Sequence, residues 1–197
     1  MTNKFAEIFW KQQTSQFWTE EEIPLASDRT PWMALSDDER DVFKKVLGGL
    51  TMLDTLQSTD GMPLIQNAFE DLQVAATLNL FSAMESIHAK SYSTIFTTVC
   101  TESEIDEIFE WVEHDRYIQF KGRAIRHEYL RLMTYNLDDN SERKSIQLYI
   151  SLVASVFLES FLFYSGFFFP LYLKGQGKMV ASGEIISLII RDESIII

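Results

Sequence analysis

Glu85 and His88 form the only Glu-x-x-His motif in this sequence of 197 residues. On an α-helix, residues three, four and seven positions apart share one stripe, so Tyr92 falls beside this pair. A carboxylate and an imidazole on one helical turn can bind a metal ion together. Taken alone the motif is weak, because a solvated acid beside a hydrogen-bonded core histidine is the commoner arrangement.

Three further acids lie in apolar segments where a charged side chain is unexpected. Asp54 lies in GGLTMLDTLQ, Glu159 lies at the centre of a long apolar run, and Glu193 follows SLIIRD. A buried carboxylate is costly unless it is paired or bound to a metal, and no pattern of Lys or Arg supplies enough partners. Together with Glu85, these acids carry four negative charges, which two divalent cations would neutralise. The residues therefore predict a dinuclear metal site.

The donor types indicate which metals such a site would take. Carboxylate oxygens with one imidazole suit iron or manganese better than zinc or copper. One acid from each of two helices, with a Glu-x-x-His motif from each of two others, is the known ligand pattern of di-iron and di-manganese bundles. We therefore predict that four side chains converge at one point inside a helical bundle: Asp54, Glu85, His88 and Glu159.

The elements that must position these residues are helical almost throughout. Eight Gly and four Pro leave few turns, about half the usual share. Ser36 is an N-cap followed by acidic first-turn residues. The expected helices are 36 to about 59, about 68 to 98, one opening at 103, one opening at 141, and about 182 to the end, with breaks at 61–63 and 136–140. We expect a single domain over 1–197, with an N-terminal arm at about 1–35 and a helical bundle at about 36–197.

Composition and charge exclude several classes of protein. With 17 basic and 29 acidic side chains, the formal charge is −12, so we expect no nucleic-acid binding, because phosphate contacts need clustered Lys and Arg. An apolar share of 46% is enough for one buried core and argues against a disordered chain. Cys100 cannot form an internal disulfide, and the start MTNKFAEIFW contains no leader. We therefore expect a cytoplasmic protein.

Residues 148–173 are long and apolar enough to span a bilayer. Glu159 at the centre, the helix-breaking Pro170 and the lack of basic flanking residues argue against a membrane helix. A helix that is apolar all round is also what the centre of a large bundle requires. We therefore expect no membrane association.

Four segments in a fixed order carry a family resemblance: LTMLDTLQ, MESIHAKSYS, VFLESFLFYSGF and LIIRDE. In this order and spacing, the sequence resembles the radical-generating small subunit of class I ribonucleotide reductase, most of all the bacterial class Ib form. The resemblance extends over nearly the whole chain from Phe17 onward. It implies an all-α, ferritin-like helical bundle with a dinuclear iron or manganese site.

The resemblance also implies a role for each reactive side chain. The implied metal ligands are Asp54, Glu85, His88, Glu159 and Glu193. Tyr92 would be oxidised to a stable tyrosyl radical, and Trp32, in TPWMAL, and Asp192 would relay an electron and a proton to the large subunit. The apolar pocket around the radical would be lined by Phe163, Phe167 and Ile189. Without the resemblance, Tyr92 and Trp32 would be interpreted as core residues and Asp192 as a surface acid.

The implied activity is the reduction of ribonucleotides to deoxyribonucleotides. In this reaction the small subunit generates the radical and passes it to a large subunit that holds the substrate. A homodimer is also implied, together with a flavodoxin-like activator that supplies oxidant when the metal is manganese.

The sequence departs from the family near its end. A second Glu-x-x-His spacing, starting at Glu193, would place a histidine ligand at position 196, where this chain has Ile196. Family members continue through further helices and a docking tail, so we expect a bundle that is incomplete at its C-terminus. Two alternatives stay open: another carboxylate-bridged dimetal oxidase of the same fold, and an inactive or truncated metal-binding bundle.

Overall fold

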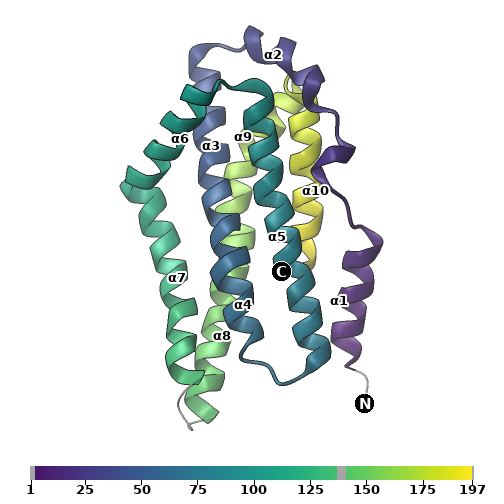
Figure 1. Ribbon diagram of the computed structural model, residues 1–197, viewed down its shortest axis with the longest axis vertical. Coiled ribbons are helices and arrows are strands. Elements are labelled where there is room, and N and C mark those ends of the chain that lie inside the picture. Colours follow the sequence, from purple (N-terminus) through teal and green to yellow (C-terminus); the bar gives the residue numbers. More distant parts are fainter. Residues whose placement is uncertain (1–2, 137–140, 197) are drawn as a thin grey trace.

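The computed structural model describes residues 3–136 and 141–196, and all regular elements in these two ranges are helical (Figure 1). In chain order they are α1 Lys4–Ser15, the 3₁₀ turns η1 Glu20–Glu22 and η2 Leu25–Asp28, α2 Arg29–Ala34, α3 Asp37–Leu56, the π-helical η3 Gln57–Gly61, α4 Met62–Gln66, α5 Leu72–Val99, α6 Glu102–His114, α7 Arg116–Asn136, α8 Ser141–Phe157, the π-helical η4 Leu158–Leu162, α9 Phe163–Gly175 and α10 Val180–Ile196. The all-α class predicted from the sequence is confirmed.

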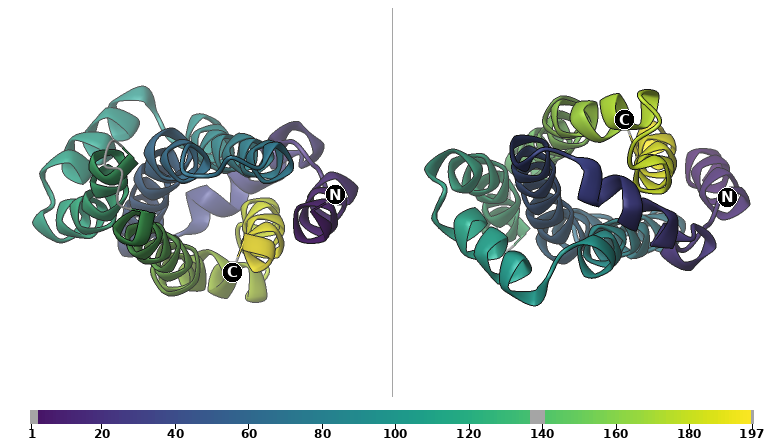
Figure 2. Two further views of the ribbon diagram at one scale, coloured as in Figure 1. Left: turned by 90° about the horizontal axis from the view of Figure 1, so that it is seen from below. Right: turned by 90° about the horizontal axis from the view of Figure 1, so that it is seen from above.

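The long helices pack side by side along the long axis of the molecule (Figure 1). α3 contacts both α5 and α9, and α10 contacts both α9 and α5. α6 and α7 lie on one flank, whereas α1 lies on the opposite flank against α5 and α10 (Figure 2). The arm that follows α1 crosses one end of the bundle as η1, η2 and α2. The main core therefore lies between α3, α5, α9 and α10.

Side-chain caps fix where the helices begin. Ser36 caps α3 as predicted, because its hydroxyl accepts the N–H of Glu39 and the Glu39 carboxylate accepts the N–H of Ser36. Asp71 caps α5 by accepting the N–H groups of the second and third residues of that helix. This helix therefore begins at Leu72 and not near residue 68. Caps of this kind typically stabilise a helix by about 1 kcal/mol.

The predicted helix break at residues 61–63 is wrong. The helix of α3 widens into η3 and continues directly as α4. In a π-helical turn each N–H bonds five residues back, as the Met62 N–H does to the Gln57 carbonyl. Pro63 has no N–H to donate, and it lies at the first turn of α4, where a donor is not needed. The break was predicted on the assumption that a continuous helix here would have α-helical hydrogen bonds throughout, whereas this helix contains a π-helical turn.

A continuous helical stretch runs from α8 through η4 into α9. Within the described residues, the stretch Glu142–Gly175 is long and apolar enough to cross a membrane by length and composition alone. Its central Glu159 is fully buried, and α9 packs against α3 and α10. The absence of membrane association stays a prediction. The polar break predicted at 136–140 falls on residues 137–140, which lie outside the described ranges.

A buried aspartate in the arm holds the start of α10. The Asp28 carboxylate accepts hydrogen bonds from the backbone N–H of Ala181 at 3.1 Å, and from the backbone N–H and the hydroxyl of Ser182, each at 2.7 Å. The first N–H groups of a helix have no partner within it, so a carboxylate here satisfies them and interacts favourably with the helix dipole. α10 begins at Val180, close to the predicted start at Ser182. Asp28 thus fixes the N-terminal arm to the last helix.

Asp28→Ala should lower the free energy of unfolding by about 2 kcal/mol, because it leaves three buried donors without an acceptor. Urea denaturation followed by circular dichroism measures the change. Asp106→Ala, at an exposed position of α6, is the matched control and should stay within about 0.5 kcal/mol of the wild type. Equal losses in the two variants would show that Asp28 does not anchor α10.

Candidate metal centre

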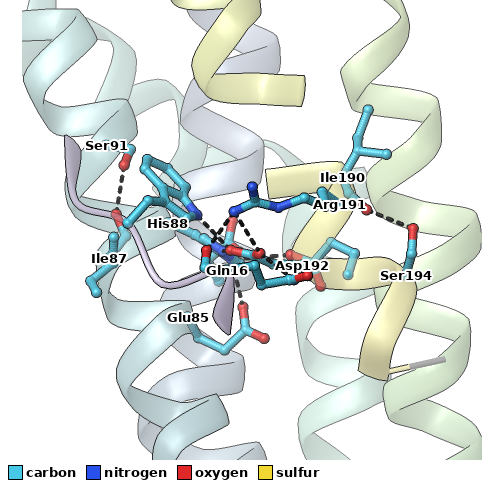
Figure 3. Close-up of polar contacts among 12 residues, drawn as sticks. Gln16, Glu85, Ile87, His88, Ser91, Ile190, Arg191, Asp192 and Ser194 are labelled. Atoms are coloured by element: carbon cyan, nitrogen blue, oxygen red, sulfur yellow. Dashed lines mark hydrogen bonds and ion pairs between the residues drawn. The ribbon is translucent and has the colours of Figure 1, made fainter. Parts of the chain in front are cut away.

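The five predicted ligands come from four parts of the bundle. Asp54 lies in the last turn of α3, Glu85 and His88 lie in the middle of α5, Glu159 lies in η4, and Glu193 lies in α10. All five side chains are fully buried. Figure 3 shows Glu85 and His88 on the side of α5 that faces α10.

Four of these side chains form a compact group: Asp54, Glu85, His88 and Glu193. Each offers one ligand atom, and these atoms all lie within 4.8 Å of one another. His88 Nδ1 lies 3.1 Å from Glu193 Oε1, 3.3 Å from Glu85 Oε2 and 3.8 Å from Asp54 Oδ1. The structure therefore brings together residues from three helices that are far apart in the sequence.

Glu159 lies outside this group of four but within its electrostatic reach. Burial raises the pKa of Glu159 well above its usual value, and the charges of Glu193, Glu85 and Asp54 raise it further. An acid from η4 thus adjoins acids from α3, α5 and α10.

The donor set fits a metal site because most of its carboxylate oxygens have no hydrogen-bond partner among the described residues. Among the described residues, both carboxylate oxygens of Asp54, Glu159 and Glu193 and one of Glu85 are buried without a hydrogen bond. Within those residues, the only ion pairs of these acids are with His88. Unpartnered buried carboxylates are rare in folded proteins. Oxygen donors with one imidazole match the iron or manganese site that the sequence predicts.

Crowding of the acids shifts their pKa values. Burial, followed by the charge of Glu85, raises the pKa of Asp54 well above its usual value. Burial and the charge of Glu193 raise the pKa of Glu85 to about 7. Burial favours the neutral ring of His88, but its contacts with Asp192 and Glu193 outweigh burial and raise its pKa. Without metal the cluster holds protons, which a divalent cation would displace.

Asp192, next to the predicted ligand Glu193, links the cluster to the N-terminal arm. Its Oδ2 accepts a hydrogen bond from Trp18 Nε1 at 2.6 Å and lies 3.2 Å from His88 Nε2. Its Oδ1 accepts a hydrogen bond from the side-chain amide of Gln16 at 2.8 Å (Figure 3). The Trp18 ring also stacks on His88, with ring centroids 6.1 Å apart and an interplanar angle of 22°. The carboxylate of Asp192 thus joins an imidazole to an indole.

Trp32, which the resemblance implies as a relay residue, is not the tryptophan that bonds to Asp192. Trp32 lies in α2 and packs edge-on against Phe43, with ring centroids 5.8 Å apart. The tryptophan at Asp192 is Trp18. Both tryptophans lie in the N-terminal arm, and only the path of the arm along α5 and α10 decides which one reaches the site. The only local signal for Trp18 is the aromatic pair that it forms with Phe17 just after α1.

The sequence matches a known protein family over nearly its whole length. The model of that family, "Ribonucleotide reductase, small chain", matches residues 1–196. The chain belongs to this family. It is 47% identical to the ribonucleoside-diphosphate reductase subunit beta of Bacillus subtilis (strain 168), over 97% of this chain and 56% of that protein. The solved structure of dimanganese(II)-NrdF from Streptococcus sanguinis has 44% sequence identity and a TM-score of 0.87, and the match covers 99% of this chain and 64% of that chain.

The predicted resemblance to the class I small subunit and the ferritin-like bundle are both confirmed. The chain spans about half the length of the curated relatives it matches. For the ribonucleoside-diphosphate reductase 2 subunit beta of Escherichia coli (strain K12), 39% identical, the match covers 94% of this chain and 54% of that protein. An R2-like ligand-binding oxidase, 19% identical with a TM-score of 0.77, shares the fold.

Tyr92 lies one helical turn beyond His88 on α5. It is fully buried, and its hydroxyl has no hydrogen-bond partner among the described residues. Burial, and then the charge of Asp54, raise its pKa well above the usual value, so the phenol stays protonated. The residues of the predicted apolar pocket are fully buried in the same core: Phe163, Phe167 and Ile189.

Without metal, the protein should become less stable as the pH rises from about 4.5 to about 7. Glu85 has a pKa of about 7 in the folded state against 4.5 for the unperturbed group. Between these values the folded state holds a proton that the unfolded state has lost, so stability falls as the pH rises. Glu85→Gln, whose amide resembles the protonated acid, should remove a dependence on the order of 2 kcal/mol.

Urea midpoints measured in the presence of a chelator across this pH range test the prediction. Glu107→Gln, at an exposed position of α6, is the control and should follow the wild-type profile. Parallel profiles for Glu85→Gln and the wild type would contradict the shift assigned to Glu85.

Trp18→Phe should lower the free energy of unfolding by about 1–3 kcal/mol more than Trp32→Phe does. Both indoles are buried, so the two changes remove a similar area, but only the first leaves the Asp192 carboxylate without its indole donor. Urea denaturation of the two variants side by side measures the difference. Equal losses would show that the hydrogen bond of Trp18 to Asp192 is of little weight.

Proposed function

We propose that this chain forms the metal-binding, radical-generating part of a ribonucleoside-diphosphate reductase subunit beta. In that role it supplies a radical to a large subunit that reduces ribonucleotides to deoxyribonucleotides. The observation that carries the proposal is the buried group of Asp54, Glu85, His88 and Glu193 on the same bundle as the buried Tyr92. The identity of 47% with the Bacillus subtilis subunit beta supports it.

The metal would be a pair of iron or manganese ions. Its ligands would be the five buried residues Asp54, Glu85, His88, Glu159 and Glu193. The dimanganese(II) state of the Streptococcus sanguinis relative, 44% identical, supports manganese as one of the two candidate elements. When bound, the dinuclear centre would supply the oxidising power that removes one electron from a nearby phenol.

Tyr92 is suited to hold a radical because the core excludes water and external reductants from it. Its raised pKa means that the phenol gives up its proton together with an electron and not before. After burial, the charge of Asp54 is the largest cause of this raised pKa. The aromatic rings of Phe163 and Phe167, whose centroids lie 5.8 Å apart, would keep the surroundings apolar.

Asp192 and Trp18 form the route by which we expect an electron and a proton to leave the site. Asp192 lies between His88 and Trp18 and contacts both, and the indole stacks on the imidazole. The partly exposed Arg191 donates to the backbone oxygen of Gln16 at 2.6 Å. The route would therefore reach the surface where the arm lies against α10, and the large subunit would bind there.

The remaining partners belong to the same proposal. A second copy of the chain would form a homodimer, and a flavodoxin-like protein would supply oxidant to a manganese centre. The formal charge of −12 argues against a nucleic acid as a further partner.

A cytoplasmic location belongs to the same proposal. Cys100 has a free thiol, as is typical of the reducing cytoplasm.

One observation favours a second candidate, an inactive metal-binding bundle. Ile196 stands where the repeated Glu-x-x-His spacing calls for a histidine, and its side chain lies outside the described part of the structure. An aliphatic side chain has no lone pair for a metal, so one metal position would lack a ligand. A different dimetal oxidase of the same fold would share the ligands without needing the contact of Trp18 with Asp192.

Metal loading followed by electron paramagnetic resonance tests the proposal. In the Ile196→His variant, Fe(II) and O₂ should produce a tyrosyl signal that Tyr92→Phe abolishes while the metal content stays unchanged, because Tyr92 lies beyond the ligands. Tyr149→Phe, at an exposed tyrosine of α8, is the control and should keep the signal. A signal that survives in Tyr92→Phe would assign the radical to another residue. A chain that binds no metal would refute the proposed function.

A further inference from the structure

Tyr129 is a second fully buried tyrosine, and it joins two of the ligand-bearing helices from outside the ligand set. It lies on α7, a helix that carries none of the site residues described above. Its hydroxyl donates a hydrogen bond to Gln57 Oε1 at 2.6 Å and lies 2.9 Å from Ser155 Oγ. Because the phenolic proton is given to Gln57, the hydroxyl of Ser155 is the donor to Tyr129. All three side chains are buried.

Both partners of Tyr129 lie one helical turn from a metal ligand. Gln57 follows Asp54 by three residues, and Ser155 precedes Glu159 by four. Residues at these spacings are neighbours on the surface of a helix. Two hydrogen bonds therefore connect the helix of Asp54 to the helix of Glu159 through a single hydroxyl.

The helix changes from α to π at both of these places. Gln57 is the first residue of η3, and Ser155 lies in the last turn of α8, three residues before the first residue of η4, which contains Glu159. A π-helical turn contains an extra residue and so changes the direction of the side chains around it. The directions of the Asp54 and Glu159 carboxylates thus depend on where each π turn is held.

A glycine makes room for this arrangement. A Cβ atom at Gly61, the last residue of η3, would lie 2.8 Å from Cε2 of Tyr129 and would also overlap the side-chain amide of Gln57. Any other residue at this position would displace the tyrosine ring or its hydrogen-bond partner. Tyr129, Gln57 and Gly61 therefore pack as one unit.

Packing alone is the ordinary role of a buried tyrosine with a bonded hydroxyl. Two features of Tyr129 go beyond it: its hydroxyl bonds to the helices of Asp54 and Glu159, and it does so in one π turn and in the helical turn before the other. The charges of Glu159 and Glu85 also act on this phenol, since after burial they are the causes that raise its pKa. The hydroxyl therefore lies near the carboxylates without binding them.

We propose that Tyr129 is a positioning residue of the metal centre. Its hydroxyl, bonded to Gln57 and Ser155, holds the two π turns in the register that directs Asp54 and Glu159 toward the metal ions. The inference rests on the proposed metal-binding function. The Tyr129 hydroxyl bonds to Gln57 and Ser155 and to none of the proposed ligands among the described residues, so it acts through these two partners.

Binding of Mn(II) to the full 197-residue chain, measured from the resonance signal of the free ion, tests this role. Tyr129→Phe keeps the ring and removes the hydroxyl, and the Mn(II) affinity should fall about tenfold, the low end for groups that orient ligands. Ser155→Ala should cause a similar loss. Ser155→Thr keeps the hydroxyl, and its added methyl group has room in the cavity of about 260 Å³ that Ser155 lines, so wild-type affinity should return.

Two controls separate positioning from stability and from the metal centre itself. Leu132→Ala removes fully buried contacts on the same helix, and it should lower the melting temperature more than Tyr129→Phe does without changing the Mn(II) affinity. Asp54→Ala removes a proposed ligand and should reduce binding further than any other variant.

Each result decides the matter. Wild-type affinity in Tyr129→Phe and Ser155→Ala, with reduced binding in Asp54→Ala, would overturn the positioning role and leave the metal centre standing. An equal loss of affinity in Leu132→Ala would also overturn it, because affinity would then follow stability alone. Wild-type binding in Asp54→Ala would refute the metal centre and this inference with it.

Discussion

The structure depends on the burial of carboxylates that, among the described residues, have no Lys or Arg partner. Within the described ranges, Asp54, Glu85 and Glu159 are buried without a Lys or Arg partner, and burial with mutual repulsion raises their pKa values. Two divalent cations would neutralise the negative charges of these buried carboxylates. The same exclusion of water isolates Tyr92 from reductants. Under the proposed function, metal affinity and radical survival would therefore have a common physical origin in the dry core of the bundle.

Ligands in such a core need support from segments that carry no ligand. The N-terminal arm supports α10 at two levels, through Asp28 at the start of the helix and through Trp18 near Asp192. α7 supports the opposite side of the bundle through Tyr129. The four-helix arrangement is thus held from both flanks.

The candidate ligands could be singled out in the sequence because each is a polar residue in an apolar helical pattern, which is a local property. The contact of Trp18 with Asp192 spans 174 residues, and that of Tyr129 with Gln57 spans 72, so neither leaves a local signal. The predicted break at Gly61 failed for a related reason, because a π turn has no signature in the spacing of apolar residues. Reactive residues could therefore be identified from the local sequence, whereas the long-range contacts made by the folded chain could not.

The hydrogen bond between Asp28 and Ser182 closes a loop across 154 residues, and contacts of such separation form late in folding. During synthesis the segments with Glu85 and His88 leave the ribosome well before α10 brings Glu193. The group of Asp54, Glu85, His88 and Glu193 is therefore complete only once α10 has packed against α5 and the arm.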